Sequence, residues 1–567
     1  MEKRFVLALL LTGVVVAVTP LLMPTPPAPA VSTTVADSTA TGAAASSHAS
    51  ASATSATSAT AVVPNAEPTA VPGAATAATL PATAAETLLV HAPLAVMSFS
   101  TVGAAPLTVQ LDSYPALNTG RAKGAARPAV TLRHGAEPML RYRVIMASDT
   151  VRFDAATFTA TRGTAGADST LTFAATHGAM ALQVRYQFPS TIERAYISRV
   201  GVTVTGTTGP AFLVVDLPRG FDTQEADSVG DATLLAYSVK PVTQGARGTA
   251  FTKLDSGEKK LEPGPLSWAV AKNKYFMVGL LTPVNGKPIA EAHLEGGART
   301  RKQATHGRAE VVLSLDGGKA DFEMYAGPQS WPRLVKMGRD FETANPYGGF
   351  LQPVVQPFST IVMRMLLWMK RTVRLDYGWV LVIFGVSVRL IMWPLNQSAM
   401  RSSIKMQRLQ PELQDVQAKF KSDPQKQQQE IMRVYKDHGM SPFSPLAGCL
   451  PALIPMPVLM ALFFVFQNTI EFRGVSFLWL PDISLHDPLY ILPLAMGASM
   501  AVLSWIGMRN APPNPQAKMM AWMFPAILTM ALINSAGGLS LYYFIQNLAA
   551  LPQQWLIANE RAKAAKS

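Results

Sequence analysis

The residue with the most unusual chemical setting is Arg389, which lies in the apolar run YGWVLVIFGVSVRLIMWPL from Tyr377 to Leu395. An arginine at the centre of a membrane helix costs about 2.5–3.5 kcal/mol on insertion scales, and about 10 kcal/mol or more in simulations of an isolated helix. The predicted spans hold no acidic partner unless Asp376 or a loop acid folds inward. The sequence therefore predicts a water-filled concavity around Arg389 or, because Leu395 is only six residues away, a side chain that snorkels to cytoplasmic phosphates.

Uncharged polar residues in the later apolar segments are the remaining candidates to line such a concavity. An amide without a partner is unfavourable in lipid, and Gln546 and Asn547 lie near the middle of the last segment. Others, including Gln467 and Asn534, lie near segment ends, where they either join the groove or face headgroups. We expect a groove formed by Arg389, Gln546, Asn547, Gln467 and Asn534. The uncharged polar residues considered for these segments are Gln467, Asn468, Asn534, Ser535, Gln546, Asn547, Gln553 and Gln554.

Motifs for covalent or metal chemistry are missing from the sequence. It has no Gly-x-Ser-x-Gly elbow, no His-Glu-x-x-His and no phosphate loop, and Cys449 is the single cysteine. His438 precedes Gly439, where a helix should end, so we expect it to cap that helix. The predicted spans also lack the Asp, Glu or His that a proton-coupled or ion-coupled transporter uses. The sequence predicts a protein that is not an enzyme and has no catalytic residue, metal site or cofactor.

Composition indicates a membrane protein that carries an aqueous domain. The chain has 567 residues, of which 49% are hydrophobic and 15% charged. Of the charged residues, 28 basic and 25 acidic ones lie between residues 24 and 357, and 21 basic and 11 acidic ones lie elsewhere. The net charge of +13 therefore accompanies the hydrophobic segments, which favours binding to the lipid bilayer over direct reading of nucleic acid.

The N-terminal part is expected to contain an anchor, a tether and a β-domain. Residues 1–23 are long and apolar enough to cross a bilayer, either as a retained signal anchor or as a signal peptide cleaved near Ala28–Ala30. Residues 24–84, rich in Ala, Ser, Thr and Pro, predict a disordered tether. Residues 85–340 contain short runs of period two separated by turn residues, which predicts an all-β sandwich of antiparallel strands.

The C-terminal part is expected to form an α-helical core of five spans, which makes six with the N-terminal anchor. Residues 358–374 predict an interfacial amphipathic helix, with packing on the sandwich as the alternative. A cytoplasmic helical hairpin of coiled-coil type is expected at 396–439, because it holds eight basic and five acidic residues and apolar residues at helical spacing. The core comprises 377–557, and its expected spans are 377–395, 444–467, 488–507, 519–535 and 538–557.

Positive charge in short loops predicts the orientation. Lys3, Arg4, the hairpin, Arg509 with Lys518, and the basic tail 558–567 all fall on one side of the predicted membrane. Basic loops are retained in the cytoplasm, so both termini are expected there and the sandwich on the opposite side.

Four stretches together resemble the YidC membrane protein insertases. They are DYGWVLVIFGVSVRLIMWPLNQSAMRSSIKMQRLQPELQ, GCLPALIPMPVLMALFFV, LHDPLYILPLAMG and SLYYFIQNLAALPQQWLI, and they cover roughly residues 340–560 in order and spacing. Tyr325–Pro328 also resembles the end of that family's periplasmic domain. The sequence departs from the family at Pro455, where related proteins often carry glutamine, and in its short basic tail.

The resemblance implies an insertase and chaperone of the bacterial inner membrane that acts alone or with the Sec translocon and uses no cofactor. Nascent membrane proteins would be its clients, Arg389 its groove arginine, and Gln546 with Asn547 its polar pair. The hairpin would capture clients or contact the ribosome or signal recognition machinery, through Arg401, Lys405, Arg408, Lys419, Lys421 and Arg433. A transporter or channel, and an envelope-binding protein anchored by its spans, stay open as alternatives.

Overall fold

The computed structural model describes most of the chain from residue 85 onward. The predicted anchor (1–23) and tether (24–84) lie outside the described residues, as do the first part of the second predicted core span and the last three tail residues. The described residues all fall within one unit, Thr83–Ser567. They are 85–118, 127–147, 149–207, 209–300, 303–304, 306–345, 352–421, 423–438, 456–509 and 515–564.

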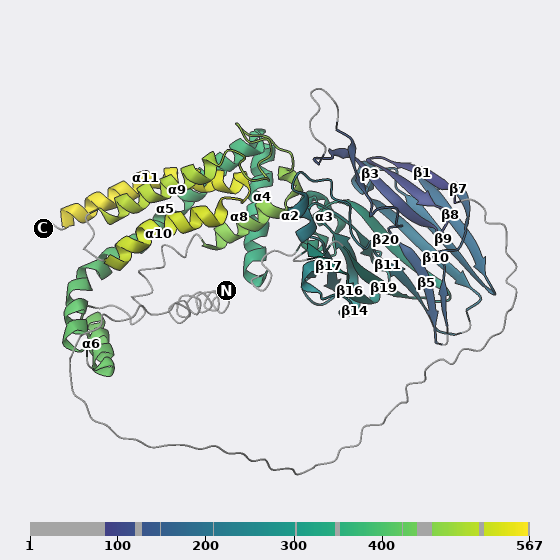
Figure 1. The fold of residues 1–567 in the computed structure, drawn as a ribbon, viewed down its shortest axis with the longest axis horizontal. Helices are drawn as coiled ribbons and strands as arrows, with labels where there is room; N and C mark the ends of the chain where they lie inside the picture. Colours follow the sequence, from purple (N-terminus) through teal and green to yellow (C-terminus); the bar gives the residue numbers. More distant parts are fainter. Residues whose placement is uncertain are drawn as a thin grey trace, which may run out of the picture. The chain divides into compact units, whose positions relative to one another are not determined.

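The β-domain starts with a four-stranded antiparallel sheet in the order β1-β2-β3-β4, of which Figure 1 labels β1 and β3. A second sheet has fourteen antiparallel strands, with the main order β6-β5-β11-β19-β16-β14-β15-β20-β10-β9-β8-β7 and with β12 and β13 beside β14. The strands are β1 Thr87–Ala92, β2 Ala95–Ser100, β3 Ala105–Pro115, β4 Ala129–Leu132, β5 Arg141–Met146, β6 Thr150–Arg152, β7 Thr159–Ala165, β8 Asp168–His177, β9 Met180–Phe188, β10 Ile197–Thr205, β11 Ala211–Asp216, β12 Ala236–Pro241, β13 Arg247–Ala250, β14 Lys259–Lys272, β15 Phe276–Leu281, β16 Ile289–Gly296, β17 Arg299–Thr300, β18 Gln303–Ala304, β19 Gly307–Ser314 and β20 Lys319–Pro328.

The long strand β14 joins the two layers of the larger sheet. Its first part, Lys259–Pro263, pairs with β16, which after a register shift also pairs with Leu266. Its second part pairs with β12 from Leu266 and with β15 from Trp268. A bulge of this kind bends a strand, so one hydrogen-bonded sheet can cover both sides of a core. The predicted all-β sandwich is confirmed.

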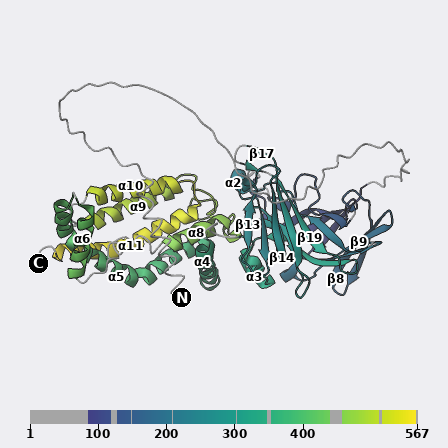
Figure 2. The ribbon, with the colours of Figure 1, turned by 90° about the horizontal axis from the view of Figure 1, so that it is seen from below.

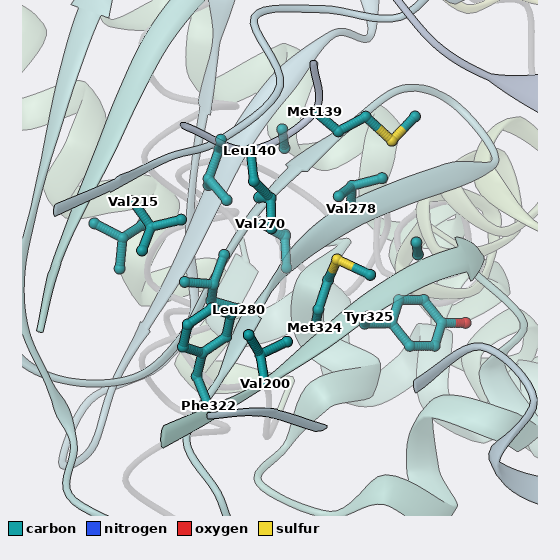
Figure 3. Close-up of a cluster of buried hydrophobic side chains, with 14 of the residues drawn as sticks. Met139, Leu140, Val200, Val215, Val270, Val278, Leu280, Phe322, Met324 and Tyr325 are labelled. Carbon is teal, nitrogen blue, oxygen red and sulfur yellow. The ribbon is translucent and has the colours of Figure 1, made fainter. Parts of the chain in front are cut away.

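The space between the layers is filled by side chains from every second position of the strands. In β9 every second residue, from Met180 to Phe188, is buried, and the residues between them are not. Figure 3 shows this core, where Leu140 and Val215 lie across from Leu280 and Phe322. Alternation of this type is what a strand with one buried face requires.

A short connector leads from the sandwich to the first long helix. The connector consists of the helix α3 (Trp331–Met337) and the 3-10 turn Phe341–Ala344. The short helix α2 (Ser228–Thr233) lies earlier in the chain, within the sandwich. Trp268 donates its indole N–H to the Arg339 carbonyl at 3.0 Å, and the buried Lys272 ammonium donates to the Asn345 amide oxygen at 3.0 Å. Buried side chains of the sandwich therefore fix the path of the connector.

The helix α4 (Gln352–Val373) begins six residues before the amphipathic segment predicted at 358–374. It buries Val362, Met363 and Leu366 against α8 and exposes Ile361 and Trp368. α4 has the predicted amphipathic pattern. Its buried face packs on helices of the core, and packing on the sandwich, the alternative from the sequence, does not account for that face.

The helix α5 (Tyr377–Lys419) contains both the first core span and the first arm of the predicted hairpin, without interruption. α6 (Pro424–Asp437) folds back on it, and Leu409, Leu413, Val434 and Tyr435 form a small apolar cluster between them. His438 is the C-terminal cap of α6, with its backbone N–H directed at the Val434 carbonyl at 3.2 Å. The capping role of His438 is confirmed, and the cytoplasmic hairpin at 396–439 stays a prediction.

The remaining helices are α8 (Met456–Asn468), α9 (Ile491–Met508), α10 (Pro515–Leu532) and α11 (Gly537–Ala564). α9 packs against α10 and α11, and α11 also packs against α5. Both views show α6 at the end of α5 where α11 also ends (Figures 1 and 2). At the opposite end, Gly537 and Gly538 donate backbone N–H groups to the carbonyls of Leu485 and Ile483.

Two described helices are long and apolar enough to cross a membrane, Tyr377–Pro394 and Ile491–Met508. The segment Lys518–Leu532 is apolar but shorter. The two long helices match two of the spans expected from the sequence, and the complete set of six spans stays a prediction.

The loop between α8 and α9 contacts both the β-domain and the helices. Ile470 belongs to the sandwich core, while Phe472, Phe477 and Ile483 belong to the helical core. Arg473 donates from Nε to both carboxylate oxygens of Glu225, at 3.0 and 2.8 Å. This loop is the main described junction between the two hydrophobic cores.

Candidate functional site

The Arg389 guanidinium lies between α5 and α11. Its Nη2 donates to the Gln553 amide oxygen at 2.8 Å. The same Gln553 side chain donates from Nε2 to the backbone carbonyl of Trp393 at 3.1 Å. One glutamine of α11 thus binds α5 at two points one turn apart.

The close approach of α5 and α11 depends on Gly385, one turn before Arg389. A Cβ there would lie 3.3 Å from Ile545 Cγ2 and 3.5 Å from Tyr542 Cδ2, so any larger side chain would push the helices apart. Two contacts between α5 and α11 have the same separation in sequence: 160 positions lie between Gly385 and Ile545, and also between Trp393 and Gln553. A constant separation is expected when two helices run in the same direction. In that register Arg389 is level with Ala549.

Arg389 therefore reaches one turn past its own level to meet Gln553, a displacement of about 6 Å along the helices. The direction is toward the end that carries α6 and the end of α11. Both alternatives from the sequence, snorkelling and a concavity open to the cytoplasm, require the guanidinium to point this way.

The charge of Arg389 is not neutralised by any carboxylate in the part of the chain that the structure describes. Its described polar partner is the amide of Gln553, and its Nε is buried without a hydrogen bond. The Tyr542 hydroxyl nearby is also buried and unpaired among the described residues. An arginine presents five donors, so a site with one protein acceptor retains capacity for water or an anionic ligand.

The other predicted groove residues do not gather around Arg389 in the described contacts. The Asn547 amide donates to Ser499 Oγ of α9 at 3.0 Å, so it joins α11 to α9 instead. Gln546 is half-buried, and Asn534 is exposed in the turn before α11. Gln467 lies in α8, and its side chain is outside the described set. Their roles in client binding stay predictions.

Gln553 is the site residue that sequence reasoning did not select. In the sequence it is one of several uncharged polar residues near segment ends, where a headgroup contact is an equal expectation. The available signal was its spacing, because Tyr542, Ala549 and Gln553 follow the seven- and four-residue intervals of one helix face.

The basic residues predicted for the hairpin divide into two groups. Lys419 and Lys421 are exposed at the turn between α5 and α6. Arg433 is exposed near the C-terminal end of α6 and forms wide ion pairs of 3.8 and 3.9 Å with Glu430 and Asp437 of its own helix. Arg401, Lys405 and Arg408 lie on α5, with side chains outside the described set. Within the described residues no cluster of three His, Cys, Asp or Glu side chains is placed to hold a metal ion.

Two family models match the chain in succession. The model for the YidC periplasmic domain matches residues 87–361, and the model for the 60Kd inner membrane protein matches residues 368–565. The first match ends and the second begins within α4, so their boundary lies between the sandwich and the rest of the helical core.

Curated relatives match about two thirds of the chain or less. A membrane protein insertase YidC from Anaeromyxobacter dehalogenans (strain 2CP-C) is 33% identical over 383 residues, which cover 65% of each chain. The corresponding protein from Chlorobaculum tepidum is 30% identical over 364 residues, covering 60% of this chain and 59% of that protein. The matches thus span just under two thirds of these relatives' length.

A solved structure of an active YidC insertase with its first transmembrane domain resolved is 19% identical. It covers 83% of this chain and 92% of that chain, with a TM-score of 0.33. A structural similarity at this TM-score adds no support beyond the sequence matches.

Proposed function

Because the chain belongs to the YidC family, we propose that it is a membrane protein insertase and chaperone of the bacterial inner membrane. The observation that carries this proposal is Arg389, a cation between two helices whose described protein partner is a neutral amide. A buried cation that served stability alone would be expected to have a carboxylate partner.

The proposed mechanism uses positive charge and water rather than covalent chemistry. A hydrated notch at Arg389, open toward the hairpin, raises the local dielectric and shortens the hydrocarbon path that a polar client segment must cross. An acidic tail enters from the cytoplasm, binds Arg389 transiently and crosses while its apolar helix moves into lipid. The membrane potential assists an acidic tail by about 2.3 kcal/mol per charge per 100 mV.

The proposed topology has an N-terminal anchor and five core spans. The loop that contains Arg473 and the α10–α11 turn share one end of the helical core, which supports an alternation of α8, α9, α10 and α11 across the membrane. Basic residues at the other end, in the hairpin and after α9, favour a cytoplasmic location for that end and for both termini. The sandwich then faces the periplasm.

The proposed partners follow from this arrangement. Nascent membrane proteins are the clients, and the exposed Lys419 and Lys421 at the hairpin turn, with Arg433 further along α6, give the hairpin basic side chains for contact with a client, the ribosome or signal recognition machinery. Cooperation with the Sec translocon is part of the proposal through family membership.

Insertion of a single-span client into proteoliposomes tests the proposal. The client is made with an acidic tail and with a neutral tail, in which Asn and Gln replace Asp and Glu. Arg389→Ala is expected to lower insertion of the acidic client at least about tenfold, and Arg389→Lys to retain most of it, because a cation in water is what matters. Arg199→Ala, which removes an exposed arginine of β10, is the matched control. Equal, full activity of both Arg389 variants would refute the charge role, and wild-type protein that inserts neither client would refute the function.

A further inference from the structure

The Gln553 side chain has a fixed orientation because both ends of its amide are used. Its Nε2 donates to the Trp393 carbonyl at 3.1 Å, so its oxygen must point the other way, toward Arg389 Nη2 at 2.8 Å. The side chain is almost fully buried, with 2% of its surface exposed. An amide held in this way presents a neutral acceptor at a constant place.

Other arginines with little exposed side chain in the described part of the molecule have carboxylate partners. Arg143 donates to Asp216 at 2.6 Å, Arg339 to Glu323 at 2.7 Å, and Arg473 to Glu225 at 2.8 Å. Each of these cations is paired with a carboxylate, which lowers the cost of removing it from water. Arg389 is held at a similar distance by a group without charge.

We propose that Gln553 is a positioning residue that holds the Arg389 guanidinium in place and leaves its charge free for carboxylates on client segments. This inference rests on the proposed insertase function and specifies its client chemistry. A carboxylate at the same point would occupy Arg389 permanently, whereas an amide acceptor positions it and still lets an acidic tail compete for the remaining donors.

The hydrogen bond to the Trp393 carbonyl would hold the Gln553 amide in place when a client binds. Trp393 directly precedes Pro394, whose ring removes the backbone N–H that would bond the Leu390 carbonyl one turn earlier. α5 is therefore weakened next to the site, and the bond from Gln553 ties this stretch to α11. Gln553 thus links the position of the guanidinium to a turn of α5 that lacks one backbone hydrogen bond.

The test measures the ratio of acidic-client to neutral-client insertion for variants of position 553. Gln553→Glu should lower insertion of the acidic client about tenfold, because the new carboxylate pairs with Arg389, and leave the neutral client within about twofold. Gln553→Met removes the acceptor at similar size and should lower the acidic client about three- to tenfold. Gln553→Asn, which keeps an amide but shortens its reach, should behave in the same way.

Gln554→Met is the matched control, since Gln554 is the next residue and its side chain lies beside Gly507 of α9. Its ratio should equal that of the wild type. Gln553→Met in an Arg389→Ala background should not change the ratio further, because Gln553 acts through Arg389.

Three outcomes would overturn the inference. One is that Gln553→Glu lowers both clients equally, as a loss of helix packing would. Another is that all variants of Gln553 keep the wild-type ratio, and the third is that Gln553→Met changes the ratio without Arg389. In each case wild-type insertion shows that the proposed function itself stands.

Discussion

Arg473 and Arg389 differ in burial and in the charge of their partners: Arg473 pairs with a carboxylate, and Arg389 bonds to a neutral amide. Arg473, at the junction of the sandwich with the α8–α9 loop, has 2% of its side chain exposed, and Glu225, 5% exposed, neutralises it. Its guanidinium also lies 5.4 Å from the centre of the Phe276 ring. Arg389, between α5 and α11, is only partly buried and is held by an amide.

The difference separates a cation that fixes structure from one that is available for binding. A dry ion pair satisfies both charges and excludes competitors, so Arg473 serves the junction. A cation with unused donors and partial exposure can bind an anion or water, which is the role in client binding that we propose for Arg389. Charge alone, read from the sequence, does not distinguish these roles, whereas the identity of the partner does.

Replacing Arg473 tests the structural half of the comparison and should have the largest effect on stability. Arg473→Met leaves the Glu225 carboxylate buried and unpaired, which is expected to cost about 3–5 kcal/mol of unfolding free energy. Thermal unfolding of the purified protein in detergent measures it. The double variant Glu225→Gln with Arg473→Met should recover most of the loss, and a double variant as unstable as the single one would contradict the role of the ion pair.

The buried Glu471, two residues before Arg473, should give the junction a smaller, pH-dependent contribution. Burial raises the pKa of Glu471 to about 7, and its single described side-chain partner is Ser330 Oγ at 3.1 Å. The folded protein keeps a proton between about pH 4.5 and 7 that the unfolded chain has released, so stability falls as pH rises through this window. The loss is expected to be about 2–3 kcal/mol.

Unfolding temperatures at pH 5 and pH 8 measure this effect, with Glu471→Gln as the comparison. Burial also raises the pKa of Glu225 and of Asp231, so the wild type keeps some pH dependence from those groups. The variant should lose the part due to Glu471 and be less sensitive to pH. An identical pH dependence in both proteins would contradict the assignment.

The sequence predicted the fold at the level of elements but not of their connections. Period-two runs identified the sandwich, since buried alternate residues such as Val184 and Tyr186 leave that pattern. The order of fourteen strands and the passage of β14 between layers depend on tertiary pairing, which local patterns do not contain. α5 was divided at residue 396 because polarity changes there, yet a helix continues through a change of polarity when its backbone is satisfied.

The sequence predicts Arg389 as a site residue, but it does not identify Gln553 as the partner of Arg389. Arg389 stands out because a charge in an apolar run is rare. Which amide meets it depends on the rotation and register of α11 against α5, and these are set by the contact at Gly385. The sequence favoured Gln546 and Asn547 by depth, but Asn547 is turned toward Ser499, and Gln553 was set aside.

The central claim is that position 389 is reached by water from the hairpin side, and cysteine labelling tests it most directly. In a Cys449→Ser background, Arg389→Cys is compared with Leu390→Cys, whose parent side chain is 61% exposed on α5 and would face lipid. Lys421→Cys on the exposed hairpin gives the full rate. A membrane-impermeant maleimide is added from the cytoplasmic side, and it reacts with thiolates, which form poorly in apolar surroundings. The account predicts rapid labelling at position 389 and little at position 390; a cysteine at position 389 as unreactive as the one at position 390 would contradict it.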